Sequence, residues 1–245
     1  MVTLASWVPW SALYALTGGA FVGLGLGALR LPRLDIPPEA KARWLSPFVG
    51  WIGTWRALPL IAFVLTYKLG EFAIGPMVKP YWVDRGATLV EIGLVPTALG
   101  IGLSIAGSLV GGAFIARYGV LTSLWALGLP QAVSNLGYAA VAQWQLARPA
   151  LYAASMIDSF SAGLGTAAFL AFFMAVCDRE GATLQYAFLS SLFSFTGRLA
   201  GAVSGLGAER WGYGPYFALT FLVSLPGLAL LPWVAPWIKE SRETR

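Results

Sequence analysis

Two charged residues interrupt an apolar run that is long enough to cross a membrane. The run extends from Ala57 to Lys79, and Lys68 and Glu71 lie near its middle. About 20 helical residues, at about 1.5 Å each, match the hydrocarbon core of a bilayer, so both charges are expected inside the membrane. Each would cost about 2.5 to 3.5 kcal/mol at the bilayer centre on insertion scales. Their spacing places them on one helix face. There they form either a structural ion pair or part of a transport pathway, and we favour the pathway because other spans carry charges at a similar depth.

The composition indicates an all-α, polytopic membrane protein. Of the 245 residues, 58% are hydrophobic and 11% are charged, whereas soluble domains carry about 25% charged residues. Seven transmembrane helices are predicted, at about 8–29, 57–79, 92–116, 120–142, 150–176, 184–208 and 214–236. The single cysteine, Cys177, excludes an intrachain disulfide. Histidine is absent, which removes the commonest metal ligand and proton relay, and no metal or cofactor is expected.

The distribution of Lys and Arg predicts the orientation. Ten of these residues fall in the loops and the tail on one side of the predicted membrane, and four fall on the other. By the positive-inside rule, the N-terminus lies outside and the C-terminal tail, 237–245, lies in the cytoplasm. The loop 31–56 carries Trp44, Phe48, Trp51 and Trp55 at helical spacing, which predicts a segment lying at the cytoplasmic membrane interface. The net charge of +5 therefore reports topology and gives no sign of a nucleic-acid partner.

Two further charges lie inside predicted spans. Asp158 is in the fifth span and Arg198 in the sixth. At about 1.5 Å per residue, both lie about 12 to 16 Å from the outer ends of their spans, as do Lys68 and Glu71. The four charges sum to zero, as expected if they neutralise one another around a cavity.

The charged residues allow two interpretations each. Lys68 and Arg198 either bind carboxylates of a substrate or hold helices together as ion pairs. Glu71 and Asp158 are candidates for the coupling proton, because a carboxyl group in a poorly hydrated site can exchange its proton near neutrality. Asp158 can equally be the fixed partner of Arg198, and removing both would then be less damaging than removing either.

Four uncharged residues complete the set of candidate site residues. Gln131 and Asn135 are four residues apart in the fourth span, and we favour interhelical hydrogen bonds over substrate binding for both. Tyr67 and Tyr186 could meet sugar or peptide groups, although an aromatic side chain in a membrane helix usually serves packing.

The turn after the third span resembles a loop signature of major facilitator transporters, Gly-x-x-x-Asp-Arg-x-Gly. Gly112, Arg117 and Gly119 match it, but Ala116 occupies the aspartate position. Any charge relay that depends on this aspartate is therefore lost from this turn or moved elsewhere.

Four motifs, in order, resemble the AmpG-type muropeptide permeases and their acetyl-CoA-transporter relatives within the major facilitator superfamily. They are Tyr67-Lys68-Leu69-Gly70-Glu71, the segment 131–138, the segment 163–169 and the segment 182–192. The resemblance implies proton-driven import of anhydro-muropeptides through the bacterial inner membrane. It also implies that 57–236 is the six-helix C-terminal bundle, and that 1–30 corresponds to the last helix of the N-terminal bundle.

The length leaves a second interpretation open. A major facilitator transporter needs two bundles, and most of the first is absent from this sequence. The chain is therefore expected either to work with a separate N-terminal half or to be an inactive product of a truncated or split gene. A membrane-embedded enzyme is disfavoured, because the sequence shows no nucleophile, metal cluster or carboxylate pair at one surface.

Overall fold

The computed structural model describes residues 10–30, 50, 53, 57–177 and 181–243, and these form helices and short connections without any strand. A helix lies within each of the seven predicted ranges. The predicted interfacial segment, with Trp44, Phe48, Trp51 and Trp55, falls outside the described residues.

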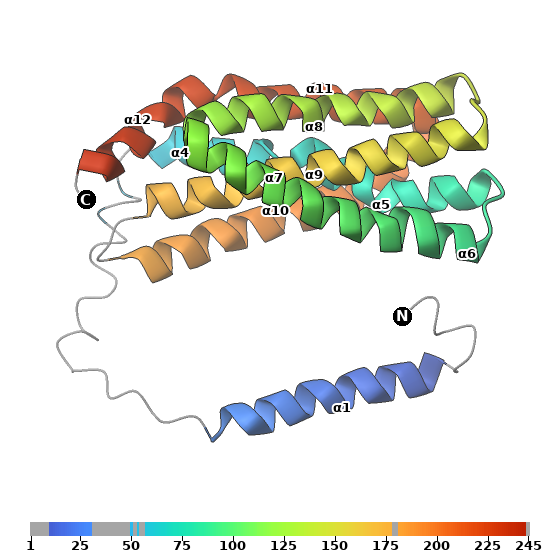
Figure 1. Ribbon diagram of the computed structural model, residues 1–245, viewed down its shortest axis with the longest axis horizontal. Helices are drawn as coiled ribbons and strands as arrows, with labels where there is room; N and C mark the ends of the chain where they lie inside the picture. Colours follow the sequence, from blue (N-terminus) through green and yellow to red (C-terminus); the bar gives the residue numbers. More distant parts are fainter. Residues whose placement is uncertain (1–9, 31–49, 51–52, 54–56, 178–180, 244–245) are drawn as a thin grey trace.

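The helices, labelled in Figure 1, have the following bounds. They are α1 (Trp10–Ala28), α4 (Ala57–Thr66), α5 (Leu69–Asp84), α6 (Leu89–Ile92), the π-helix η2 (Gly93–Leu99), α7 (Gly100–Tyr118), α8 (Val120–Gln143), α9 (Arg148–Val176), α10 (Ala182–Trp211), α11 (Tyr213–Ala229) and α12 (Leu231–Glu243).

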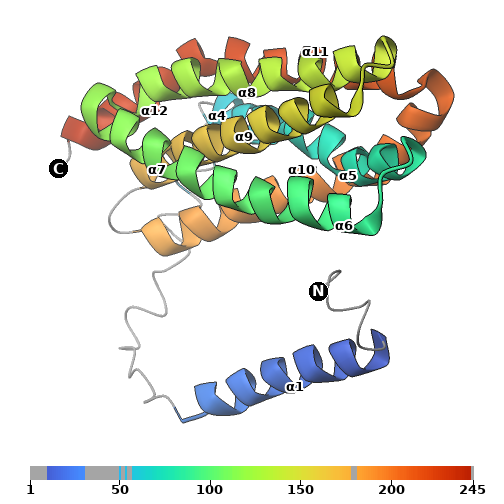
Figure 2. The ribbon, with the colours of Figure 1, turned by 45° about the vertical axis from the view of Figure 1, so that its right-hand side comes forward.

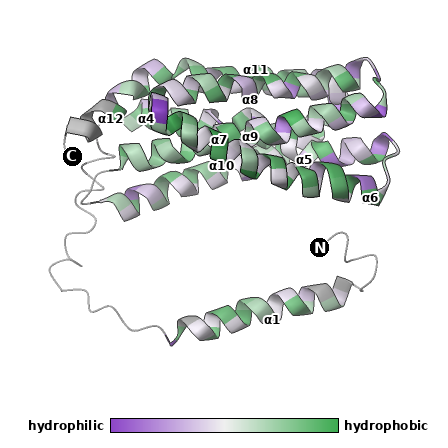
Figure 3. Cartoon of the chain, in the orientation of Figure 1, coloured by the Kyte–Doolittle hydropathy of each residue, from purple (hydrophilic) through white to green (hydrophobic). Residues whose placement is uncertain are grey.

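Several of these helices are long and apolar enough to cross a bilayer. Three stretches qualify, Ala57–Asp84, Leu89–Tyr118 and Arg148–Val176, and α11 with α12 qualifies as a pair bent by 44°. The helices α8 and α10 have 24 and 30 residues, so they also have the length of a span. Figure 3 shows the apolar residues distributed along the helices. The described chain is therefore a membrane helix bundle.

The helices from α4 to α12 pack side by side, whereas α1 lies apart from them in both ribbon views (Figures 1 and 2). In the bundle, α9 packs against α7 and α8, α11 packs against α8 and α5, and α10 packs against α5.

The second predicted span is not one uninterrupted helix. It breaks at Tyr67 and Lys68, between α4 and α5, two residues before Gly70. The break coincides with a close approach from α11, because a Cβ atom on Gly227 would collide with the backbone of Tyr67. Packing against a neighbouring helix thus accompanies the irregular backbone at this point.

The core divides into two apolar clusters with a polar layer between them. One cluster contains Phe63, Phe169 and Phe173, and the other contains Trp82 and Phe217. Along α4 and α5, the first cluster ends at Tyr67 and the second begins at Ile74. Lys68 and Glu71 occupy the interval, so this ion pair lies between the two apolar clusters.

Glycines allow α7 and α9 to approach closely. A Cβ atom on Gly107 would collide with the carbonyl oxygen of Phe160, and one on Gly163 would collide with that of Ser104. Membrane helices associate largely through such small-residue contacts, since lipid offers no hydrophobic advantage to a buried apolar side chain.

We expect Gly163→Val to lower the thermal stability of the purified chain in detergent, because the added methyl groups must displace the backbone of α7. Overpacking of this kind typically costs about 1–3 kcal/mol. Gly102→Val is the matched control, because Gly102 has open space where its Cβ atom would lie. Equal melting temperatures for the two variants would contradict the close packing of α7 on α9.

Candidate functional site

An open cavity of about 610 Å³ lies between α5, η2, α7, α9 and α10. Three charged residues line it: Glu71, Asp158 and Arg198. Its hydroxyl groups come from Ser104, Ser159 and Ser194. Charges that the sequence places at one depth on three different spans therefore meet in one cavity.

A second hollow of about 580 Å³ continues along α10. It shares Ser194 and Arg198 with the first cavity. Its other lining residues are Phe188, Ser190, Ser191, Leu192 and Phe195. Arg198 is thus positioned at the junction of two hollows, one that contains carboxylates and one lined by serine and phenylalanine.

Lys68 does not line either cavity. Its side chain is 1% exposed, at the break between α4 and α5. Its Nζ donates to Glu71 Oε2 in an ion pair and to Thr166 Oγ1 at 2.9 Å. The ammonium group is therefore already neutralised and hydrogen-bonded inside the bundle, which favours the structural interpretation of Lys68 over direct substrate binding.

Glu71 connects the buried polar cluster with the open cavity. On its buried side, Oε2 accepts hydrogen bonds from Lys68 Nζ and from Gln131 Nε2. Its side chain is nevertheless 30% exposed and lines the cavity. A proton or a ligand that enters the cavity can therefore reach Glu71, and through Glu71 it can act on the buried ammonium group of Lys68.

Asp158 accepts a hydrogen bond from Ser134 Oγ at 3.0 Å. The anticipated ion pair between Asp158 and Arg198 is not formed. Among the described residues, the ion pairs are Lys68–Glu71 and Arg148–Glu91. Arg198 is exposed and makes no hydrogen bond or ion pair with another described residue. Both residues thus present their charges to the cavity.

Three of the uncharged candidates serve packing in this structure. The hydroxyl of Tyr67 donates to the carbonyl oxygen of Leu124 at 2.8 Å, and its ring stacks on Phe169. Asn135 Nδ2 donates to Thr220 Oγ1 at 3.0 Å, an interhelical hydrogen bond of the kind expected. Tyr186 packs edge-to-face on Phe173, away from the residues that line the cavity.

The fourth uncharged candidate, Gln131, also bridges helices, since it lies on α8 and bonds to Glu71 on α5. With Tyr67 and Asn135 it lines a small closed cavity beside Glu71. These three residues surround the buried side of Glu71 and are not ligands of the open cavity.

The turn of the loop signature has a conformation that demands glycine. Gly119 has φ +80° and ψ 167°, which side chains rarely adopt, and it directly joins α7 to α8. Arg117 is exposed and its guanidinium lies 5.4 Å from the ring centroid of Tyr118. Gly112 lies one and a half to two turns earlier, on an exposed part of α7.

The sequence did not single out the hydroxyl partners Thr166 and Ser134 or the cavity serines. Serine and threonine in membrane helices commonly bond to their own backbone. Thr66, for example, donates to the carbonyl oxygen of Ala62 at 2.7 Å. Thr166 lies in the Gly-Leu-Gly-Thr stretch of one of the four motifs that resemble the AmpG-type permeases, and this position was the only sign of a role for it.

A membrane helix bundle with an open cavity lined by charged residues is also a feature of secondary transporters. Comparison with known proteins agrees. The chain is 27% identical to the anhydromuropeptide permease of Escherichia coli K12, over 92% of this chain and 47% of that protein. It is 25% identical to a Rickettsia conorii protein provisionally named transporter AmpG 4, over 78% of this chain and 46% of that protein.

An uncharacterized protein of Haemophilus influenzae is 28% identical, over 98% of this chain and 60% of that protein. No family model matches the chain. The chain spans about half the length of the curated relatives that it matches. The resemblance to the AmpG-type permeases is thus confirmed over most of the chain, and two of these three relatives are named as a permease or a transporter.

The contacts around Lys68 predict a specific pattern of coupling. Glu71→Gln should destabilise the chain because it leaves a buried ammonium without its carboxylate, whereas Lys68→Met combined with Glu71→Gln should recover much of the loss. Thermal unfolding of the single and double variants measures the coupling. Asp158→Asn and Arg198→Gln, which lack a mutual ion pair here, serve as the control and should have additive effects. Additivity at Lys68 and Glu71 would contradict the pairing.

Proposed function

We propose that this chain is the C-terminal half of a secondary active transporter of the major facilitator type, which imports muropeptides in a proton-coupled step. The observation that carries the proposal is the cavity lined by Glu71, Asp158 and Arg198. A charged side chain at this depth is costly unless it has a partner or faces a water-filled cavity. The names of the relatives supply the substrate class, since one is an anhydromuropeptide permease.

In this proposal, Arg198 binds a carboxylate of the peptide part of the substrate. Its guanidinium group is exposed, lines both hollows and has no competing partner among the described residues. A guanidinium matches a carboxylate through two parallel hydrogen bonds, which an ammonium group does not reproduce. Lys68, which is bonded to Glu71 and Thr166, fixes Glu71 from the buried side of the site.

Glu71 and Asp158 are the proposed carriers of the coupling proton. Both are reached from the cavity, and neither is paired with Arg198 in this structure. Protonation of Glu71 would remove the negative charge that neutralises Lys68, and would thereby weaken the contact between α5 and α9 that runs through Thr166. In this proposal, proton binding at Glu71 is coupled to a rearrangement of the helices.

The proposed partner is a separately encoded N-terminal half. Major facilitator sites form between two bundles, and alternating access is a movement of one bundle against the other. The cavity described here is open, so a companion bundle would cover its charges. The alternative is a truncated or split-gene half that has no activity without such a companion.

We place the protein in the bacterial inner membrane with its C-terminus in the cytoplasm, on the strength of the distribution of Lys and Arg. In this orientation α1 corresponds to the last helix of an N-terminal bundle, and 57–236 forms the six-helix half.

Uptake of labelled muropeptide tests the function. In cells that lack their own permease, the chain alone should give no uptake, and the chain produced with the N-terminal half of a related transporter should restore it. Arg198→Gln should raise KM at least about tenfold, because it removes hydrogen bonds to a charged group worth about 1.5–3 kcal/mol, and Arg198→Lys should recover only part of this loss. Lys79→Gln, an exposed cation outside the cavity, is the control. Robust uptake by the chain alone, as a monomer, would refute the need for a second half.

Maleimide labelling tests the orientation. Cys177, the only cysteine, follows the last residue of α9 at the end proposed to face the cytoplasm. A membrane-impermeant maleimide should leave it unmodified in intact cells and modify it in inverted vesicles. Modification from outside only would reverse the assignment.

A further inference from the structure

The loop signature at Gly112–Gly119 occurs a second time in this chain. Gly-x-x-x-Ala116-Arg117-Tyr-Gly has a counterpart in Gly205-x-x-x-Glu209-Arg210-Trp-Gly212. The second copy fits the signature more closely, because Glu209 supplies the acidic group that Ala116 lacks. The two copies are separated by 93 positions.

The two turns have the same backbone conformation. Gly119 has φ +80° and ψ 167°, and Gly212 has φ +76° and ψ 164°. Each glycine N–H donates to the carbonyl oxygen four residues earlier, at 2.8 Å for Gly119 and at 2.9 Å for Gly212. Each turn joins two long helices without an intervening loop, α7 to α8 in one case and α10 to α11 in the other.

The repeat extends through the helices that follow the turns. At the same separation of 93, buried positions of α8 correspond to buried positions of α11 and α12. The pairs include Leu124 with Phe217, Leu127 with Thr220, Gln131 with Ser224, Asn135 with Leu228 and Tyr138 with Leu231. The first helices of the two units also correspond, since Gly70 aligns with Gly163 and each allows a close approach to a helix of the other unit.

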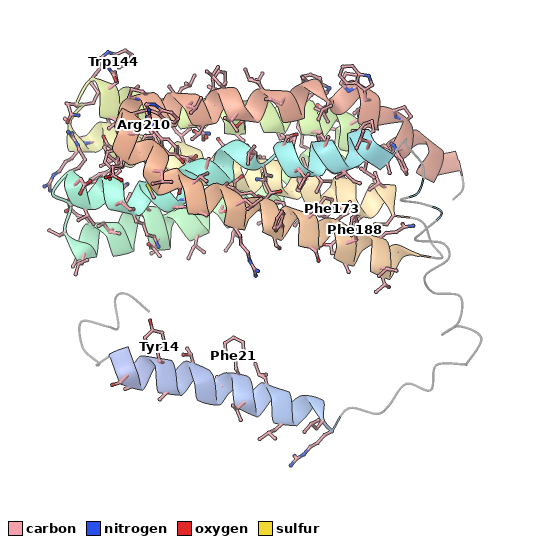
Figure 4. The ribbon with its side chains drawn as sticks, turned by 180° about the vertical axis from the view of Figure 1, so that it is seen from behind. Tyr14, Phe21, Trp144, Phe173, Phe188 and Arg210 are labelled. Atoms are coloured by element: carbon pink, nitrogen blue, oxygen red, sulfur yellow. The ribbon has the colours of Figure 1, made fainter. Side chains whose placement is uncertain are left out.

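The packing shows that the two units are inverted relative to each other. The first unit runs from α4 to α8, and the second from α9 to α12. In the first unit, α5 packs on α10 and α11 of the second; in the second unit, α9 packs on α7 and α8 of the first. The turns lie at opposite ends of the bundle in Figure 1. Gly119 precedes the first residue of α8, and Trp144 follows its last residue. In Figure 4, Arg210 lies at the same end of the bundle as Trp144, which is the end opposite to Gly119. Inverted repeats of three helices are a known basis of alternating access.

We infer that the turn Gly205–Gly212 is the outer-face counterpart of the cytoplasmic turn Gly112–Gly119, and that Glu209 and Arg210 hold the outer face closed. This inference rests on the proposed transporter function. Both side chains are exposed, and neither makes a hydrogen bond or ion pair with another described residue. They are therefore available to polar groups of the companion bundle on that face. The acidic group absent at Ala116 is present on the opposite side of the membrane.

The inversion is tested in the chain alone. In a Cys177→Ser background, Arg117→Cys should react with an impermeant maleimide only in inverted vesicles, and Arg210→Cys should react only in intact cells. Reaction of both from the same side would overturn the inverted relation, whether or not the chain transports anything.

The closing role is tested in cells that produce the chain together with a cysteine-free N-terminal half of a related transporter. Ser194→Cys, in the Cys177→Ser background, reports access to the cavity from outside. Glu209→Gln and Arg210→Gln should each increase its rate of reaction with external maleimide several-fold, and Arg117→Gln should decrease it. Lys79→Gln should leave the rate unchanged.

The outcomes separate the two proposals. Shifts in opposite directions for the two turns support the inference, because a general loss of structure would move both rates in one direction. Equal or absent shifts in a pair that still takes up muropeptide would overturn the closing role and leave the transporter function standing. Absence of uptake by the parent pair would instead count against the transporter function, and the labelling rates would still decide the role of the turns.

Discussion

The buried ammonium group of Lys68 is the constraint on which the middle of the bundle depends. An unpaired charge at this depth costs several kcal/mol, so the surrounding helices must supply its partners in fixed positions. Glu71 comes from the same helix, Thr166 from α9, and Gln131 on α8 holds the carboxylate of Glu71. Three helices are therefore held in register by one polar cluster, and the break before α5 places Lys68 where all of them can reach it.

Apolar packing encloses the polar cluster on both sides, so its charges depend on the partners within the cluster. The aromatic cluster around Phe169 lies toward one end of the helices, and the cluster around Trp82 lies toward the other. Between them, Glu71 lies on the boundary, with one side in the buried cluster and the other in the open cavity. In the proposed transport step, a proton would therefore reach Glu71 from the cavity without exposing the whole core to water.

The sequence predicted the helical segments and the depth of the charges, because both follow from apolar length and a rise of about 1.5 Å per residue. It also placed Lys68 and Glu71 on one face, since local helix geometry determines this. It did not predict the break at Tyr67, which coincides with close packing by Gly227. Nor could it decide whether Asp158 meets Arg198, because depth does not fix the rotation of α9 and α10 about their axes.

In the repeat, positions that pack the helices together recur, whereas the charged residues of the candidate site do not. Glycines and buried positions recur at a separation of 93 because each unit must pack against the other in an equivalent way. The four charges inside the spans do not recur. At the same separation, Lys68 corresponds to Ser161, Glu71 to Leu164, Asp158 to Leu65 and Arg198 to Ile105. A symmetric pair of units would place like charges opposite each other, where they repel. Because each charge has an uncharged counterpart, the two units together form one asymmetric site that carries both signs, and such a site can orient a ligand that itself carries different groups at its two ends.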